Sequence, residues 1–164
     1  TLAVIKFETD NTPPEMGKKG EVLKTLPCSY KADTIHLDDI CRKVTNACRH
    51  LGELTRTSVG EDFVYLVELA ASEIFTNIIE HAYKDAEGMI KGTLSLTTTG
   101  IEINVYDQGI GFNPNEILPP ISNPLDPSEG GYGLHIVRQI MDIAQYNIDT
   151  PQGNHWKLIK YLPE

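Results

Sequence analysis

The sequence predicts an α/β fold, a two-layer sandwich in which helices cover one face of a mixed, mostly antiparallel sheet. Two long helical patterns precede a pair of strand patterns, and a third helical pattern separates this pair from two closing strands. The strand patterns are short and alternate in polarity, as is typical of strands with one buried face. At 164 residues the chain is long enough for one core of ordinary size.

Each predicted element has its own local signal. Pro27 favours an edge position for the first strand of the sheet, because proline cannot donate a ladder hydrogen bond. Asp33 is a suitable N-cap for the amphipathic helix that follows it. In chain order we expect a strand at 22–30, helix 33–51, a connection at 52–60, helix 61–83, hairpin strands 91–99 and 101–106 about Gly100, a proline-rich loop at 112–129, a helix with Leu134, Val137, Ile140, Met141 and Ala144 on its apolar side, and strands 146–150 and 155–162.

The first twenty residues differ from the rest. Residues 1–7 have a strand pattern, but residues 8–20 are polar and rich in proline and glycine, as linkers are. The short strand resembles the closing strand of metal-dependent serine phosphatases. We therefore expect residues 1–7 to end an upstream phosphatase-like domain, residues 8–20 to be a linker and residues 21–164 to form the main domain, with an unrelated terminal strand as the alternative.

Composition excludes several classes of function. A net charge of -9 provides no basic surface, which argues against nucleic acid as a direct partner. No apolar run approaches 18 residues, so we expect no membrane contact from this segment. The three cysteines lack metal-type spacing, which favours reduced thiols and a cytoplasmic location.

Three polar residues recur at every fourth position along the most apolar helix. Glu73, Asn77 and His81 lie on one slowly drifting helical face among many aliphatic and aromatic residues. Buried carboxylates and amides cost free energy unless they are paired. One such residue alone usually finds a backbone or water partner, and the motifs in the rest of the chain are what favour a site here.

Two glycine-rich segments follow. Asp107 comes directly after the strand pattern of residues 101–106, and Gly109 and Gly111 permit close backbone approach beyond it. Each segment alone is most often an ordinary turn or flexible loop.

The second glycine segment opens a helical pattern. A glycine-rich turn at a helix N-terminus presents free N–H groups and the positive end of the helix dipole, which suits phosphate. Its residues are Gly130, Gly131, Gly133 and Leu134.

The order of these motifs resembles that of the GHKL ATPase superfamily, whose domain has the Bergerat fold. Within it, the E-x-x-x-N-x-x-x-H-A-Y run that starts at Glu73 and the G-L-H-I-V run that starts at Gly133 are most similar to the anti-sigma factor serine/threonine kinases. The resemblance extends over about residues 22–162.

The resemblance implies ATP and Mg²⁺ as cofactors and a role for each motif residue. Glu73 is the implied general base, Asn77 the Mg²⁺ ligand, and Asp107 the acceptor for the adenine amine. His81 is expected to touch phosphate or to orient its helix, and Lys84 is expected to be a solvated charge or a phosphate contact. The implied nucleotide-binding residues are Asn77, His81, Asp107, Gly109, Gly111, Gly130, Gly131, Gly133 and Leu134.

The implied function is phosphorylation of a STAS-type anti-sigma-antagonist protein by a homodimer that also binds a sigma factor. Two alternatives remain open: a nucleotide-switched binding module with little transfer activity, and the ATPase domain of a histidine kinase, which lacks here a preceding phospho-acceptor hairpin. Two departures bear on this function. No lysine or arginine occurs between Asp107 and Leu134, and Asn154 follows Gly153 where the superfamily often has threonine.

Overall fold

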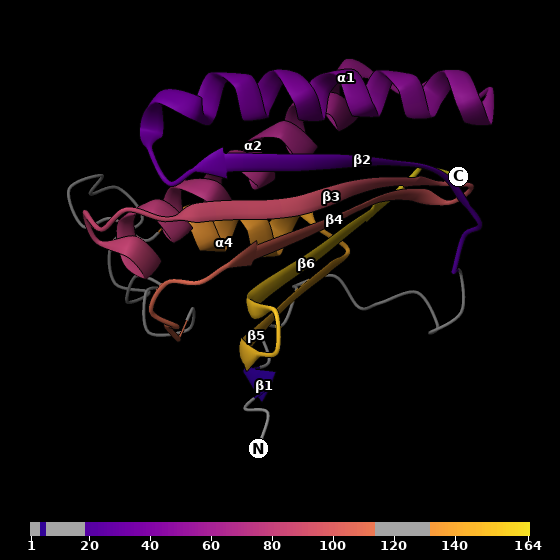
Figure 1. Cartoon of the computed structure of the whole chain (residues 1–164). Helices are drawn as coiled ribbons and strands as arrows, with labels where there is room; N and C mark the ends of the chain where they lie inside the picture. Colours follow the sequence, from indigo (N-terminus) through magenta and orange to yellow (C-terminus); the bar gives the residue numbers. More distant parts are fainter. Residues whose placement is uncertain (1–3, 6–18, 114–131) are drawn as a thin grey trace.

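The computed structural model describes residues 4–5, 19–113 and 132–164, and it confirms the α/β sandwich (Figure 1). The elements are β1 (Val4–Ile5), β2 (Val22–Lys31), the 3₁₀ turn η1 (Thr34–His36), α1 (Leu37–Thr55), α2 (Glu61–Asn77), the π-helical segment η2 (Ile78–Tyr83), β3 (Met89–Thr97), β4 (Gly100–Asp107), α4 (Tyr132–Ile140), β5 (Ile143–Thr150) and β6 (Gly153–Tyr161).

The strands form one sheet in the order β1-β5-β6-β4-β3-β2. All five pairings are antiparallel, so no parallel pair occurs in the described part of the sheet that was expected to be mixed. The sheet is strongly twisted, with β5 and β6 steeply inclined to β2 and β3 (Figure 1). Pro27 lies on the edge strand β2, as predicted.

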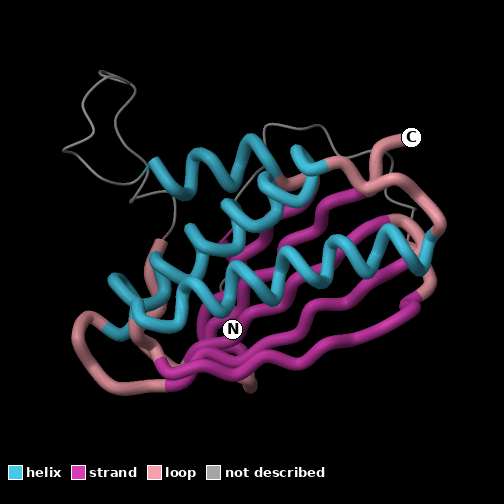
Figure 2. Tube along the Cα trace, turned by 90° about the horizontal axis from the view of Figure 1, so that it is seen from above, coloured by secondary structure: helices cyan, strands magenta, loops and turns pink. Residues whose placement is uncertain are grey.

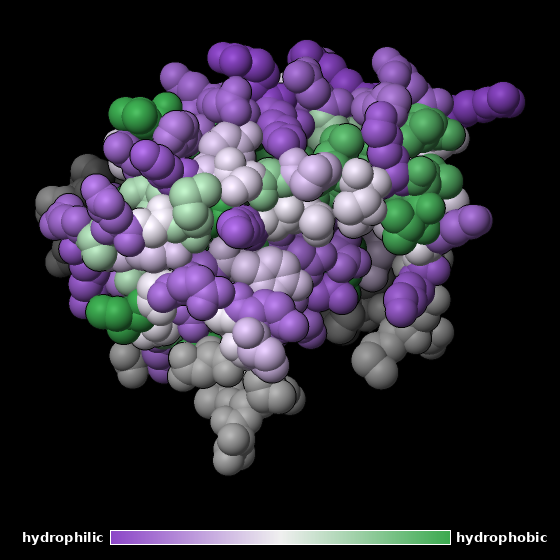
Figure 3. Space-filling view, in the orientation of Figure 1, coloured by the Kyte–Doolittle hydropathy of each residue, from purple (hydrophilic) through white to green (hydrophobic). Residues whose placement is uncertain are grey.

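The helices cover one face of this sheet (Figure 2). The apolar side of α1 is buried against the core and its opposite side is hydrophilic, as the outer surface in Figure 3 shows. Asp33 accepts a hydrogen bond from the Ile35 backbone at 3.1 Å and so caps η1. Among the described helices, none combines the length and apolar character that a membrane crossing needs. The buried residues of α1 are Ile40, Val44, Ala47, Cys48 and Leu51.

The core helix changes its winding within the polar stripe, which is the helical face that carries Glu73, Asn77 and His81. We expected one α-helix over residues 61–83, but the α-helix ends at Asn77 and the chain continues as a π-helix to Tyr83. Lys84 then adopts a left-handed conformation, with φ 43°, and ends the helical run. Segments of π-helix are rare and occur frequently at functional sites.

Three other boundaries differ from expectation for physical reasons. The helix α1 continues four residues past Leu51, and Arg56 then closes it in the left-handed conformation. Ala144 lies in β5 rather than on the helix, because the chain turns after Ile140 and pairs with β6 from residue 143 onward. The hairpin turns at residues 98–99, before Gly100, since the buried Thr97 hydroxyl accepts backbone hydrogen bonds from residues 99 and 100.

The N-terminal strand contributes only two described residues. Val4 and Ile5 pair with Asn147 and Tyr146, which places β1 on the edge of this sheet beside β5. The division into an upstream strand, a linker and a domain from residue 21 stays a prediction.

The core predicts a matched pair of stability effects on α1. Leu51 is fully buried, whereas Leu54, three residues later, is 41% exposed. We expect Leu51→Ala to lower the free energy of unfolding by about 3 kcal/mol and Leu54→Ala by less than about 1 kcal/mol. Urea denaturation measures both, and equal losses would mean that α1 is not docked as described.

Candidate functional site

Asp107 is the last residue of β4, at the C-terminal end of the strand. Alternate residues of β4 point into the core, and this inward row ends at Asp107, which is 1% exposed. Its Oδ1 atom accepts hydrogen bonds from the Gly109 backbone and from the Asn154 side chain, both at 3.0 Å. Its Oδ2 atom is buried and has no hydrogen-bond partner among the described residues.

An unpaired buried carboxylate oxygen needs an explanation, because it costs free energy. Burial raises the pKa of Asp107, although the hydrogen bonds from Asn154 and Gly109 act to lower it. Oδ2 is therefore an acceptor that the fold leaves available for a ligand donor.

Asn154 lies in this site, although we did not predict a role for it from the sequence. It lies directly opposite Asp107 on the neighbouring strand β6 and is 2% exposed. Besides its bond to Asp107, its amide donates to the Gly109 carbonyl at 3.0 Å. Asn154 thus fixes both the carboxylate and the glycine turn.

The glycine turn after β4 is fastened to the end of the helical stripe. The Ala82 carbonyl accepts a hydrogen bond from the Ile110 backbone at 2.8 Å. A Cβ at Gly109 would lie 2.5 Å from that carbonyl oxygen, so only glycine allows this approach. The Tyr83 hydroxyl accepts from the Gln108 backbone at 2.9 Å and donates to the Met89 carbonyl at 2.6 Å. No role was predicted for Tyr83, because the H-A-Y run alone does not reveal one.

The glycine segment that opens α4 contacts the polar stripe from the neighbouring helix. Gly133 lies on α4, which packs on α2, and a Cβ at this position would overlap the Glu73 carboxylate. Burial, and next the charge of Glu80, raise the pKa of Glu73. A carboxylate with these surroundings holds a proton more readily than a solvated one.

Asn77 and His81 occupy the stripe between these two contacts. Asn77 is buried and donates from its amide nitrogen to the Glu73 carbonyl at 2.7 Å, which turns the amide oxygen away from that carbonyl. The His81 ring is 5.7 Å from that of Phe112, which stacks on Tyr146 at 5.1 Å. His81 is therefore half-buried beside the glycine turn, at the junction of helix and loop.

The structure brings together most of the predicted residues, but not all can be placed. Glu73, Asn77, His81, Asp107, Gly109 and Gly133 all contact or belong to the run α2–η2 or the turn fastened to it. Gly111 is next to Ile148 and Asn154, and Leu134 is fully buried in the core. Lys84 is exposed at the helix end. Gly130 and Gly131, with most of the predicted loop at 112–129, lie outside the described residues.

Comparison with known proteins shows which family the sequence resembles. The sequence model of the histidine kinase-like ATPase domain matches residues 32–160. The serine-protein kinase RsbW of Bacillus cereus (strain AH187) is 32% identical over 117 residues, which cover 68% of this chain and 72% of that protein. The serine-protein kinases RsbW of Bacillus anthracis (strain A0248) and Bacillus thuringiensis (strain Al Hakam) give the same identity and coverage.

The contact between α4 and the stripe predicts a change in the titration of Glu73. In Gly133→Ala the new methyl group should displace the flexible Glu73 side chain toward solvent, which lowers its pKa because burial is the main cause of the raised value. Carboxyl NMR titration measures this shift. Gly60→Ala is the matched control, since no atom lies within 4 Å of a Cβ there; an unchanged Glu73 pKa in Gly133→Ala would contradict the contact.

Proposed function

The chain belongs to the histidine kinase-like ATPase family, and we propose that it is an ATP-dependent serine/threonine protein kinase. The observation that supports this most directly is the buried Asp107 Oδ2 atom without a partner among the described residues. A hydrogen-bond donor from a bound base would remove that cost. The exocyclic amine of adenine is such a donor, whereas guanine presents a carbonyl oxygen at the corresponding position.

The residues of the stripe fit the phosphate end of the nucleotide. The amide oxygen of Asn77 is a neutral ligand suited to Mg²⁺, a hard cation that takes few protein ligands and keeps several waters. The N-terminus of α4 offers backbone N–H groups and the positive end of the helix dipole. Lys84, His81 and Arg138 are the candidates for meeting phosphate charge, because the segment from Asp107 to Leu134 has no cation.

Glu73 is the proposed general base. Bound ATP would supply the phosphoryl group and Mg²⁺ the neutralisation of its charge. Glu73 would accept the proton of the acceptor hydroxyl as that oxygen bonds to the γ-phosphorus, while the bond from this phosphorus to the bridging oxygen breaks and ADP leaves. The raised pKa makes Glu73 a stronger base than a solvated carboxylate, and Gly133 leaves the room that its side chain occupies.

The proposed protein substrate follows from the relatives. The similar proteins are named serine-protein kinases, which supports a seryl or threonyl hydroxyl as acceptor here. By the resemblance of its motifs, we propose that the acceptor belongs to a STAS-type antagonist protein, and that the chain acts in the cytoplasm as a homodimeric anti-sigma factor-type regulator of transcription.

One observation favours a second candidate function. The segment from Asp107 to Leu134 has no lysine or arginine, and a kinase loop without a cation stabilises a phosphoryl transition state less. The alternative is a nucleotide-switched binding module that transfers phosphate slowly or not at all. Incubation with labelled ATP, Mg²⁺ and a STAS-type antagonist separates the two, since only a kinase yields an acid-stable phosphoprotein.

Nucleotide recognition gives the next prediction. We expect Asp107→Asn to weaken ATP binding, because the amide would present a donor to the adenine amine, and we expect GTP to bind wild type at least about tenfold more weakly than ATP, or about 1.4 kcal/mol. Isothermal titration measures both. Asp38→Asn, on the exposed first turn of α1, is the control; unchanged ATP affinity in Asp107→Asn would remove Asp107 from the base pocket.

The same variant should not lose stability, which separates lost binding from unfolding. Burial raises the folded-state pKa of Asp107, so wild-type stability falls as the pH rises from the ordinary carboxylate value through the raised one. The neutral amide removes that loss. At pH 7 we therefore expect a free energy of unfolding equal to or above that of wild type.

Phosphoryl transfer distinguishes the base from the metal ligand. Glu73→Gln should retain ATP binding but lower transfer by about 10²-fold or more, since an amide cannot accept the proton. Asn77→Ala should lose Mg²⁺-dependent binding as well as transfer. If Glu73→Gln transfers phosphate at the wild-type rate, another residue is the base.

A further inference from the structure

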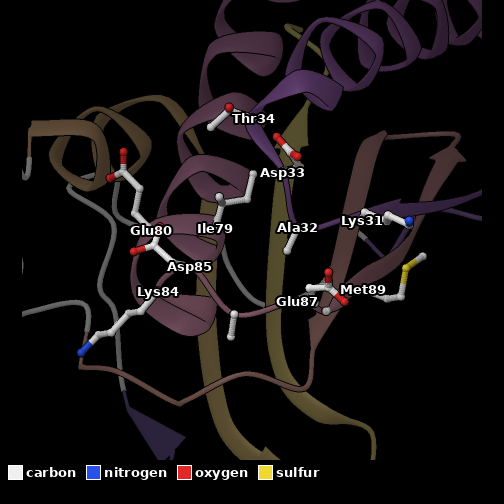
Figure 4. Close-up of a pocket in the computed structure, with 12 residues that line it drawn as sticks. Lys31, Ala32, Asp33, Thr34, Ile79, Glu80, Lys84, Asp85, Glu87 and Met89 are labelled. Atoms are coloured by element: carbon white, nitrogen blue, oxygen red, sulfur yellow. The ribbon is translucent and has the colours of Figure 1, made fainter.

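A concave surface lies beside the site. This groove has a volume of about 1060 Å³ and is enclosed by the end of β2 with its turn, residues 31–34, and by the segment 84–89 that follows η2 (Figure 4). Ile79 and Glu80 of η2 also line it. Of the described residues proposed to contact nucleotide, Lys84 also lines the groove, whereas Asn77, His81 and Asp107 do not. The two surfaces therefore meet at Lys84 and otherwise consist of different residues.

The groove has an apolar lining and acidic side chains. Ala32, Ile79, Ala86 and Met89 provide the apolar part, and Met89 is 40% exposed. Lys31 and Lys84 stand on opposite sides in Figure 4. Four carboxylates line the groove against these two lysines, which gives a formal charge of -2: Asp33, Glu80, Asp85 and Glu87.

These carboxylates are available for a cationic partner. Within the described part of the chain, no ion pair of theirs lies within 4 Å, whereas other surface carboxylates such as Glu61 and Glu102 have one. All four are exposed. No three His, Cys, Asp or Glu residues are grouped closely enough among the described residues to hold a metal ion, so the charge is spread along a groove rather than gathered at a point.

The groove and the nucleotide site share one helical segment. Ile79 and Glu80 line the groove, while Asn77 and His81 on either side of them belong to the site. The Tyr83 hydroxyl joins the Met89 carbonyl at the groove to the Gln108 backbone, which is next to Asp107. A partner in the groove would therefore contact the segment that positions the site.

We propose that this groove binds a basic, extended segment of a protein partner. Lysine and arginine side chains fit both features, because their aliphatic stems cover apolar surface while their charged ends reach carboxylates. Carboxylates come from both walls, so the segment needs at least two cations, with an apolar side chain between them over Ile79 and Met89. Nucleic acid and anionic lipid are disfavoured by the same charges. The proposal adds a substrate-binding surface to the proposed kinase. It rests on the kinase function only in taking the partner to be a protein substrate.

The location of binding is the direct test. The probe is the capped peptide Arg-Leu-Lys-Arg-Leu-Lys, titrated without nucleotide into the full ¹⁵N-labelled chain, and we expect chemical-shift changes concentrated in residues 31–34 and 79–89. The same peptide with glutamate in place of every cation should produce none. Changes spread over the acidic surface, or absent from both segments, would overturn the proposal.

Matched variants separate the groove from the general negative charge. Asp85→Asn with Glu87→Gln should weaken peptide binding about fivefold. Glu61→Gln with Asp62→Asn removes the same charge from the first turn of α2, about 27 Å along the helical run from Ile79, and should leave binding unchanged. Equal losses in the two double variants would overturn the proposal, as would equally tight binding of spermine, which has the charges without the apolar side chains.

This test is independent of catalysis. The peptide titration needs neither ATP nor Glu73, so its failure removes the groove and leaves the kinase proposal standing. Failure of the ATP titration would remove the kinase proposal and leave the groove mapping unaffected.

Discussion

The hydrogen bond from Ile110 to the Ala82 carbonyl is the interaction that holds the site together. The last carbonyls of any helix lack partners within the helix. Here the π-helical end of the core helix directs one of them to the glycine turn that follows Asp107. The turn is thereby fixed to the helix that carries Glu73, Asn77 and His81, so two motifs separated by more than twenty residues act as one surface.

The pKa values of the two carboxylates of the site, Glu73 and Asp107, are raised for the same reason. Burial is the largest cause of the raised pKa for both Glu73 and Asp107. Asp107 is 1% exposed, whereas Glu73 is half-buried. At both positions burial disfavours the charged form of the carboxyl group. At Asp107 the result is a fixed acceptor whose orientation is set by Asn154 and Gly109. At Glu73 the neighbour is Gly133, whose lack of a Cβ leaves room for the carboxylate.

Much of this arrangement was predictable, because it depends on local patterns. Period-two alternation placed Asp107 at a strand end, and the four-residue spacing placed Glu73, Asn77 and His81 on one helical face. The π-helical turn was not predictable, since the apolar residues within 78–83 have the spacing that an α-helix also has. Asn154 was undervalued for a different reason. Its importance comes from pairing with a strand 47 residues away, and register between distant strands leaves no local signal.

The position of the acidic groove follows from the same helical run. An element that is nearly apolar all round must be covered on every side, but η2 is covered only in part, because Ala82 and Tyr83 are buried whereas Glu80 is exposed. There, one side meets the glycine turn and the other borders open surface lined by Glu80 and the segment 84–89. Because Tyr83 is hydrogen-bonded toward both sides, a ligand that binds at one surface contacts the element that supports the other surface. Such an element is the physical requirement for coupling a partner to a nucleotide, since coupling needs a shared structure whose energy both ligands alter.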